Sequence, residues 1–234
     1  MSDAKDKIVI SLGGSLVVPD GGPNTKFLSE FNRFIRKKLA ENKNRQFFIV
    51  VGGGKVARNY RDAGKEVVGK ELTPDDLDWL GIHATRLNAH LLRTIFRDIA
   101  HPNIIKDYGV IRKAAEPVVI GAGWKPGWST DYDAVLLCKD YGADTVINLS
   151  NIQQVYDKDP KKFSDAKPIN KISWKEFKKL VGSKWGPGLN APFDPIASAK
   201  ASKLGIKAVI LRGDNLKNLD NYFKNKKFVG TIIN

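Results

Sequence analysis

Residues 8–15 read Ile-Val-Ile-Ser-Leu-Gly-Gly-Ser and join a short run rich in β-branched side chains to a pair of glycines. The pattern recurs twice: FFIVV at residues 47–51 runs into three glycines at 52–54, and PVVI at 117–120 runs into Gly-Ala-Gly. Short apolar runs that stop at glycine are typical of buried strands followed by tight turns. The three segments therefore predict three strands, each ending in a glycine-rich loop.

Helical periodicity and capping signals occupy the intervals between strands. Phe27, Phe31 and Phe34 recur at helical spacing and predict a helix over residues 26–42. Thr73 and Pro74 suit the N-cap and first turn of a long helix whose apolar stripe continues to Ile99. The same signals predict helices that begin near Lys55, span 131–142, begin after Ser173 and span 195–204; strands over 145–149, 208–211 and 229–233 with a short helix between the last two; and loop or hairpin over 153–172.

Strands that alternate with helices predict an α/β fold, a three-layer α-β-α sandwich around a mainly parallel sheet. We expect one domain over residues 1–234, with the loop 101–116 as the boundary between lobes 1–116 and 117–234. In an open parallel sheet the carboxyl ends of the strands share one edge, where ligands bind. Glycine loops followed by helix N-termini offer N–H donors to anions there. Three such loops predict a trough for a long polyphosphate, or for two phosphorylated ligands that meet head to head.

Composition narrows the classes of protein. The chain has 234 residues and a formal net charge of +14, which favours polyanionic partners without identifying one. The single cysteine excludes an internal disulfide, and the apolar runs are too short to span a bilayer. Residues 1–7 lack the pattern of a signal peptide, so we expect a cytoplasmic chain without a membrane partner. His83 and His90 are too widely spaced for a metal pair, and no protein-held metal is predicted.

Two common phosphate-binding patterns are absent. Gly54-Lys55 is followed by Val56 where a P-loop requires Ser or Thr. Gly121-x-Gly123 meets Pro126 where a dinucleotide-binding fold requires a third glycine. The loops must therefore serve another phosphate-binding fold, or only form tight strand–helix turns.

Seven motifs, taken in order and spacing, resemble the amino acid kinase family, and within it the archaeal-type uridylate (UMP) kinases. The resemblance covers residues 7–233, and its motifs are ISLGGS at 10–15, VVGGGKxAR at 50–58, GIxATRxNA at 81–89, PGxSTD at 126–131, NxSNxxxVYxxDP at 148–160, FDPIA at 193–197 and GTII at 230–233. Each motif is modest on its own, but together they are specific.

The resemblance implies transfer of the ATP γ-phosphoryl group to UMP, which gives UDP and ADP with Mg²⁺ as cofactor. It also implies that the chain forms a homo-oligomer and that its small-molecule partners are the nucleotides ATP and UMP. By the family pattern the UMP-binding residues are Gly53, Asp78, Trp124, Lys125, Pro126, Gly127, Trp128, Ser129 and Thr130. The ATP-binding residues are Ser11, Gly13, Gly14, Ser15, Gly54, Arg58, Ser150, Asn151, Tyr156 and Asp159. We expect Lys7, Gly14, Arg58 and Asp131 to be catalytic, the cationic groups by neutralising phosphate charge.

The chain departs from the family pattern at several positions. Ser11 stands where many of these kinases carry lysine, so the charge-neutralising lysine stays open between Lys7 and Lys55. Asp131 is also a candidate N-cap for its helix. By the resemblance, residues 124–130 form the loop around the base and phosphate of the acceptor, here named the acceptor loop. Trp124 and Trp128 crowd this loop, where the indoles can stack on a pyrimidine or pack beneath the loop.

Other functions stay open at this point. One is a kinase of the same fold for an amino acid, a carbamate or a different phosphate; another is a nucleotide binder without turnover, to which Ser11 and Gln153-Gln154 give some support. Nucleic-acid binding through the net charge is less favoured, because no zinc-finger, RNP or basic-zipper pattern accompanies the lysines.

Overall fold

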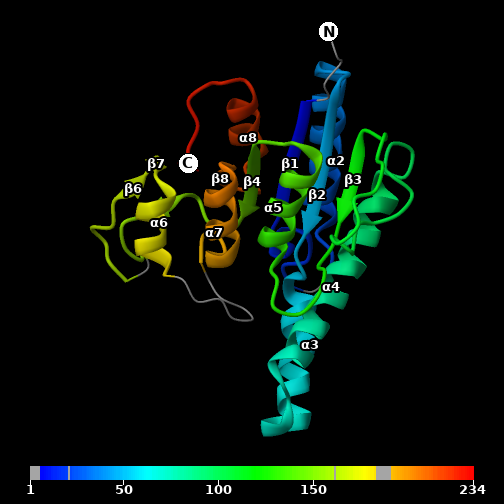
Figure 1. Ribbon diagram of the computed structural model, residues 1–234, viewed down its shortest axis with the longest axis vertical. Coiled ribbons are helices and arrows are strands. Elements are labelled where there is room, and N and C mark those ends of the chain that lie inside the picture. Colours follow the sequence, from blue (N-terminus) through cyan, green and yellow to red (C-terminus); the bar gives the residue numbers. More distant parts are fainter. Residues whose placement is uncertain (1–5, 21, 161, 183–190) are drawn as a thin grey trace.

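A seven-stranded sheet forms the centre of the computed structural model, which describes residues 6–20, 22–160, 162–182 and 191–234 (Figure 1). Its strand order is β3-β2-β1-β4-β8-β9-β7. The strands are β1 (Asp6–Leu12), β2 (Arg45–Val51), β3 (Val118–Gly121), β4 (Thr145–Ser150), β7 (Lys171–Ile172), β8 (Lys207–Arg212) and β9 (Thr231–Ile233). Neighbouring strands pair in parallel except β8 and β9, so the prediction of a mainly parallel sheet is confirmed.

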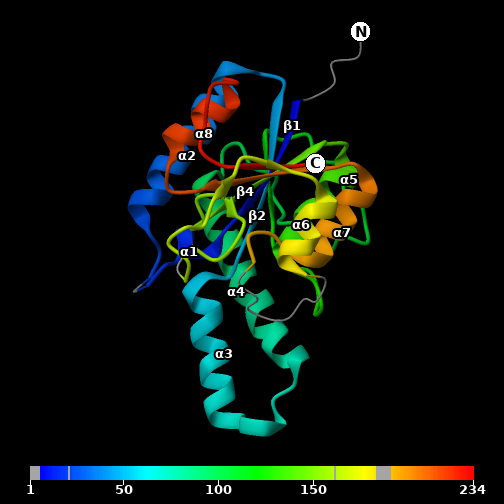
Figure 2. The ribbon, with the colours of Figure 1, turned by 90° about the vertical axis from the view of Figure 1, so that its left-hand side faces the viewer.

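Helices cover both faces of the sheet (Figure 2). They are α1 (Gly14–Val17), α2 (Thr25–Glu41), α3 (Gly54–Val68), α4 (Pro74–Ile95), α5 (Thr130–Tyr141), α6 (Trp174–Val181), α7 (Pro195–Leu204) and α8 (Leu216–Phe223), with a 3₁₀ turn at Gly69–Glu71. Among the described residues, none of the helices combines the length and the apolar composition that crossing a bilayer requires.

The two faces of the sheet belong to two separate apolar cores, because successive side chains of a strand point to opposite faces. In β1, Ile10 and Leu12 pack with α2, α4 and α8, while Val9 packs with α5, α6 and α7. In β2, Phe47 and Phe48 divide between the same two cores. The three-layer α-β-α sandwich is thus confirmed.

Two helix starts follow the capping chemistry read from the sequence. Thr73 and Asp76 form a reciprocal capping box at the start of α4, with Pro74 in the first turn. Ser173 and Glu176 form the same arrangement at α6. Both N-cap predictions are confirmed.

The ends of some elements differ from expectation. Helix α4 ends at Ile95 rather than Ile99, because the chain turns there and Ala100 bridges to Val118 beside β3. The predicted hairpin within 153–172 is β5 (Val155–Tyr156) with β6 (Pro168–Ile169). The short β7 was missed, since two residues carry no periodic signal. Of the N-terminal segment in which no signal peptide is predicted, residues 1–5 lie outside the described residues.

Cys138, the one cysteine of the chain, lies on α5 inside the core between the sheet and α7. Its thiol is buried, and burial raises its pKa above the ordinary value. Its role is therefore apolar packing.

The loops that follow β1 and β2 are in direct backbone contact. A Cβ added at Gly14 would lie 2.1 Å from the Gly54 nitrogen and 2.5 Å from the Gly52 carbonyl oxygen. Gly54 itself has φ +63, a conformation that favours glycine. Only glycines let these two loops approach so closely.

Gly14→Ala is therefore expected to lower the free energy of unfolding by about 3 kcal/mol, the upper range for overpacking against atoms that cannot yield. Chemical denaturation monitored by circular dichroism measures the change. Gly142→Asn is the matched control: Gly142 has φ +72 and open space around its Cα, and asparagine tolerates that conformation. Equal stability of Gly14→Ala and wild type would contradict the close contact.

Candidate functional site

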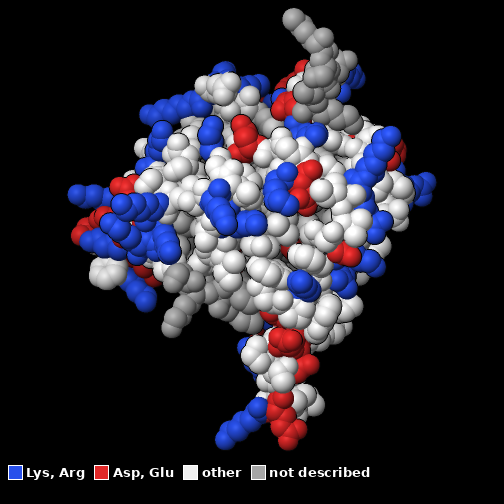
Figure 3. All heavy atoms as spheres, in the orientation of Figure 1, with Lys and Arg blue, Asp and Glu red and all other residues white. Residues whose placement is uncertain are grey.

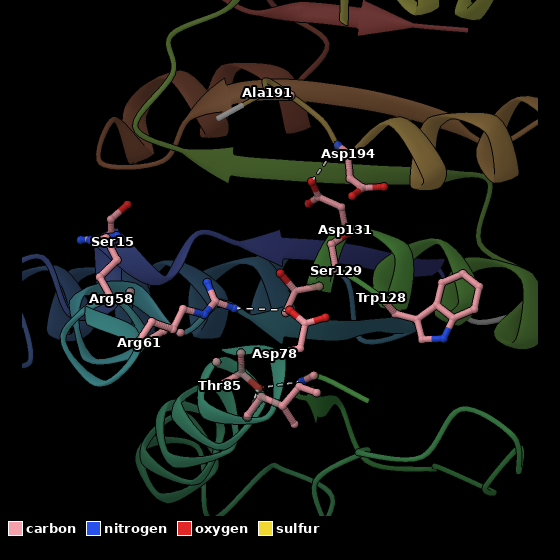
Figure 4. Close-up of a pocket in the computed structure, with 18 of the residues that line it drawn as sticks. Ser15, Arg58, Arg61, Asp78, Thr85, Trp128, Ser129, Asp131, Ala191 and Asp194 are labelled. Atoms are coloured by element: carbon pink, nitrogen blue, oxygen red, sulfur yellow. Dashed lines mark hydrogen bonds and ion pairs between the residues drawn. The ribbon is translucent and has the colours of Figure 1, made fainter. Parts of the chain in front are cut away.

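A pocket of about 590 Å³ opens at the carboxyl edge of the sheet, where the glycine loops meet (Figure 4). Its walls come from both halves of the chain: the loops after β1, β2 and β3, helices α3 and α4, and the start of α5. The lining residues are Ser15, Gly52, Gly53, Gly54, Ala57, Arg58, Arg61, Asp78, Gly81, Ile82, Thr85, Gly123, Trp128, Ser129, Thr130, Asp131, Asn151, Ala191 and Asp194.

Asp131 lies in the wall of the pocket, held by groups from three elements. Its Oδ1 accepts hydrogen bonds from Ser11 Oγ of β1 (2.7 Å) and Asn148 Nδ2 of β4 (2.8 Å). Its Oδ2 accepts from the Asp194 backbone N–H (3.2 Å). Burial raises the pKa of Asp131 to about 6; the Ser11 hydrogen bond opposes this shift and the charge of Asp194 adds to it. The carboxyl is thus held in position, with its pKa raised well above the ordinary value of 3.8.

The alternative role of Asp131 as helix N-cap is wrong. Ser129 is the N-cap of α5, and its side chain accepts from the Tyr132 N–H. Asp131 is then in the first turn, at the positive end of the helix dipole, with its side chain turned into the pocket.

Asp131 and Asp194 are two of the three aspartates among the described residues that line the pocket, and Asp78 is the third. Magnesium in kinases is usually held by one or two carboxylates together with phosphate oxygens. The donor set of this pocket fits that requirement. Across the described ranges, no three His, Cys, Asp or Glu side chains are grouped to hold a metal by protein ligands alone.

Asp78 ties the opposite wall of the pocket to the acceptor loop. It is buried on α4, its Oδ2 accepts from the Gly127 N–H (2.8 Å), and its Oδ1 lies 3.8 Å from Arg61 Nη2 of α3. Gly127 has φ +85, which lets the loop turn toward Asp78. Helices α3 and α4 and the loop before α5 are thus linked through one carboxylate.

The two tryptophans of the acceptor loop differ in position. Trp128 lines the pocket and stacks on Tyr132, with ring centroids 4.1 Å apart. Trp124 packs at an angle against Tyr108, which is buried, and Lys125 lies over the outer face of its ring. Trp128 therefore lies in the pocket wall, whereas Trp124 packs against Tyr108; stacking of an indole on a pyrimidine stays a prediction.

Ten of the 21 predicted site residues line this pocket. Ser15, Gly53, Gly54, Arg58, Asp78, Trp128, Ser129, Thr130, Asp131 and Asn151 line it. A second group supports the lining from behind. Gly13 and Gly14 form the loop under α1, Ser11 holds Asp131, and Gly127 donates to Asp78.

Other predicted residues lie outside the lining. Lys7 is at the far end of β1, about 20 Å along the strand from Gly13 at the usual rise per residue, and donates to the Tyr141 carbonyl oxygen. Its place at the amino end of a strand keeps it from the pocket. Trp124, Lys125, Pro126, Ser150, Tyr156 and Asp159 are likewise absent from the described lining. Lys55 pairs with Asp20 at 3.3 Å, both exposed.

Three lining residues with polar side chains, Arg61, Thr85 and Asp194, were not predicted. Arg61 follows Arg58 by one helical turn, and that spacing is the signal that could have revealed it. Thr85 accepts from the Gly123 N–H (2.8 Å) and donates to the Ile82 carbonyl (2.6 Å), which secures the third glycine loop to α4. Asp194 is the N-cap of α7 and accepts from the Ala197 N–H (2.6 Å). The Asp-Pro pair of the motif at 193–197 therefore indicates the start of a helix and does not reveal that Asp194 lines the pocket.

Comparisons with known proteins agree with this architecture. A uridylate kinase of Thermococcus sibiricus is 34% identical over 235 residues, covering 97% of this chain and 99% of the relative. A uridylate kinase of Thermoplasma volcanium is 35% identical over 232 residues, covering 97% of each. The crystal structure of uridylate kinase from Archaeoglobus fulgidus has a TM-score of 0.80 at 32% identity, covering 97% of this chain and all of that one.

A UMP kinase structure from Bacillus anthracis, at 19% identity and TM-score 0.78, shares the fold. The family model described as "Amino acid kinase family" matches residues 6–212, which include the strands and glycine loops that build the pocket. With near full-length relatives, a shared fold and this match, the chain belongs to the amino acid kinase family.

Proposed function

We propose that this chain is an ATP-dependent kinase that transfers the γ-phosphoryl group of ATP to UMP, giving UDP and ADP. One observation carries the proposal: three glycine loops and the carboxylates of Asp78, Asp131 and Asp194 meet at a single pocket, in a chain similar over nearly its whole length to uridylate kinases. Both substrates are anionic and must meet in line, and a pocket built from backbone N–H groups and arginines is suited to that.

The loops after β1 and β2 bind the transferring phosphates in this mechanism. Their backbone N–H groups, fixed by the contact between Gly14 and Gly54, stabilise charge on the equatorial oxygens without reorganisation. Arg58 of α3 adds a positive charge at the same wall. Because Lys7 lies at the other end of β1, we assign the cationic role to Arg58, with Lys55 at the adjacent rim.

Asp131 and Asp194 would hold the Mg²⁺ that accompanies ATP. The ion would supply charge neutralisation for the phosphate oxygens. Asp131 is kept in place by Ser11, so in this chain a hydroxyl occupies the site where a lysine is common and orients the carboxylate instead. The side chain of Ser11 thereby acts through Asp131.

We assign the acceptor to the side formed by Asp78 and residues 124–130, and ATP to the side formed by Gly54, Arg58 and residues 150–159. Lobes 1–116 and 117–234 are proposed as the acceptor and ATP sides, although the acceptor loop itself crosses from the second lobe to α4. Trp128 offers a ring face for the pyrimidine in this arrangement.

Surface charge gives less support to nucleic-acid binding. On the face shown in Figure 3, Lys and Arg are densest over the edge that carries β6, β7 and α6, and Asp and Glu are interspersed across the body. On this face the positive charge therefore forms no continuous track of the kind that binding of a nucleic-acid backbone favours.

We also propose that the chain forms a homo-oligomer, through the arm that α3 and α4 extend from the body (Figure 2). Exposed apolar side chains on this arm support it: Tyr60 (61% exposed), Val67 (84%), Val68 (46%), Trp79 (42%) and Leu87 (62%). Light scattering coupled to size exclusion should give a mass above 26.0 kDa. Val67→Asp should lower that mass, whereas a monomeric wild type would refute the oligomer.

The acceptor is tested by steady-state turnover in a coupled ADP assay with UMP, CMP, glutamate and carbamate. UMP should give a higher kcat/KM than glutamate or carbamate, because only a nucleotide presents a ribose to Asp78 and a ring to Trp128 together. CMP shares both groups, so the ratio of its kcat/KM to that of UMP measures selection between the two bases. Faster turnover with glutamate or carbamate would assign the chain to another kinase of this fold. ATP binding without ADP release for any acceptor would show a non-catalytic binder.

Asp131→Asn should lower turnover by at least about tenfold, the loss expected when one transition-state contact is removed. Since the folded-state pKa of Asp131 is raised to about 6 from 3.8, its ionisation is disfavoured by folding. The stabilisation of the neutral carboxyl is complete below pH 3.8 and is lost as pH rises through about 6. Wild type should therefore lose stability relative to Asp131→Asn over this window.

Denaturation curves of both proteins from pH 3.5 to 8, without nucleotide, measure this difference. Nucleotide is omitted because phosphate itself titrates near pH 6. Parallel stability profiles would contradict the raised pKa, and undiminished turnover would remove Asp131 from the reaction.

A further inference from the structure

Arg61 is the one arginine besides Arg58 that lines the pocket within the described residues, and no motif of the family resemblance includes it. The two arginines are three residues apart on α3 and face the same cavity, yet they have different neighbours (Figure 4). Arg58 points toward the segment after α1, with its Nη2 3.5 Å from the Pro19 carbonyl oxygen. Arg61 lies against α4.

The guanidinium of Arg61 is fixed on the surface of α4. Its Nε donates to the Leu77 carbonyl oxygen at 2.9 Å, and its Nη2 lies 3.8 Å from Asp78 Oδ1. Gly81 lies directly beneath: a Cβ added there would be 2.2 Å from Nη2 and 2.8 Å from Cζ. The planar group thus rests on bare helix backbone.

Glycine in a helix interior costs about 1 kcal/mol relative to alanine. In α4 the glycine at position 81 leaves room for the Arg61 guanidinium, because any residue with a Cβ there would clash with it. The side chain of Arg61 is only 21% exposed, so its rotamer freedom is largely lost before any ligand binds. A cation held in advance binds an anion with a smaller entropic penalty.

The neighbours of Arg61 place it on the Asp78 side of the pocket. Asp78 uses Oδ2 for the Gly127 N–H of the acceptor loop, while Oδ1 faces Arg61 at a distance too long for a hydrogen bond. Apart from its bond to Leu77, the Arg61 side chain makes no hydrogen bond within the described part of the chain. A guanidinium carries five N–H donors, so several remain for a ligand.

We propose that Arg61 is a specificity-determining residue for the acceptor, whose guanidinium, seated on Gly81 beside Asp78, binds the phosphate of the nucleoside monophosphate. This inference rests on the proposed function, since it presumes that Asp78 holds the ribose. A ribose and its 5′-phosphate are adjacent in the ligand, as Asp78 and Arg61 are adjacent in the pocket.

The pairing explains selection of a phosphorylated acceptor. A lone Asp78 would bind ribose hydroxyls but repel a neighbouring phosphate, whereas the Arg61 charge offsets that repulsion and adds charge-assisted hydrogen bonds. Arginine is better suited than lysine here, because its planar fork engages two phosphate oxygens at once.

The test compares the binding of UMP with that of uridine by calorimetry, in wild type, Arg61→Gln and Asp78→Asn. Arg61→Gln should weaken UMP binding by about 10- to 100-fold, as loss of a charge-assisted contact does, and change uridine binding less than about twofold. Asp78→Asn should weaken both ligands. The matched control is Lys65→Gln, the same charge change one turn farther along α3 on a side chain that is 58% exposed; it should alter neither.

Kinetics supply a second, independent readout. Arg61→Gln should raise KM for UMP and leave KM for ATP within about twofold of wild type, whereas Arg58→Gln should raise KM for ATP. Arg61→Lys should recover part of the loss in UMP affinity.

Two outcomes would overturn the role of Arg61: unchanged UMP affinity in Arg61→Gln, or an equal loss for UMP and uridine, which would indicate a disturbed pocket. Failure of the proposed function looks different, because wild type itself would then form no ADP from UMP. The comparison of UMP with uridine would still decide whether Arg61 contacts the phosphate.

Discussion

The rest of the site depends on a direct contact between the backbones of the loops that follow β1 and β2. Neither loop can carry a side chain at the contact, since a Cβ on Gly14 would overlap the Gly54 nitrogen. The parallel pairing of β1 with β2 brings the two loops to the same edge, and their helices α1 and α3 then start side by side. Both helix starts reach the pocket, because Ser15 of α1 and Gly54 of α3 are among its lining residues.

Around this contact the polar groups are arranged in two walls. Asp131, Ser11 and Asn148 tie α5 to β1 and β4, and Asp78 ties α4 to the acceptor loop. Asp78 is buried and Asp131 is partly buried, and each has hydrogen-bond donors from other elements, which is what permits charge in a packed region. Because the charged groups of the pocket are already held in position, they need to move little when a reaction takes place there.

The amount of this structure that could be predicted follows from how local each signal is. The strands that end in glycine and the helices that begin after Thr73 or Ser173 are each predicted by a few consecutive residues, and the structure confirms these strands and helix starts. Lys7 shows the limit of such inference: as a residue type it suits phosphate chemistry, but the direction of β1 decides that it lies at the opposite edge. Strand direction is a property of the whole sheet.

Arg61 and Thr85 were missed for a related reason. Their place in the pocket depends on the packing of α3 against α4 and of α4 against the third glycine loop, which are contacts between distant segments. The two-residue strand β7 is also a tertiary product, formed where it meets β9. The hydrophobic periodicity of one segment does not show which distant segment it will contact.

The buried state of Cys138 has a practical consequence for following this chain in solution. Since its only thiol is enclosed between the sheet and α7, maleimide and iodoacetamide reagents have no reactive target on the native fold. A single cysteine introduced on the exposed surface of the α3–α4 arm would then be labelled alone, without first removing the native one. Fluorescent or spin probes attached there would report how the arm moves relative to the sheet as nucleotides enter.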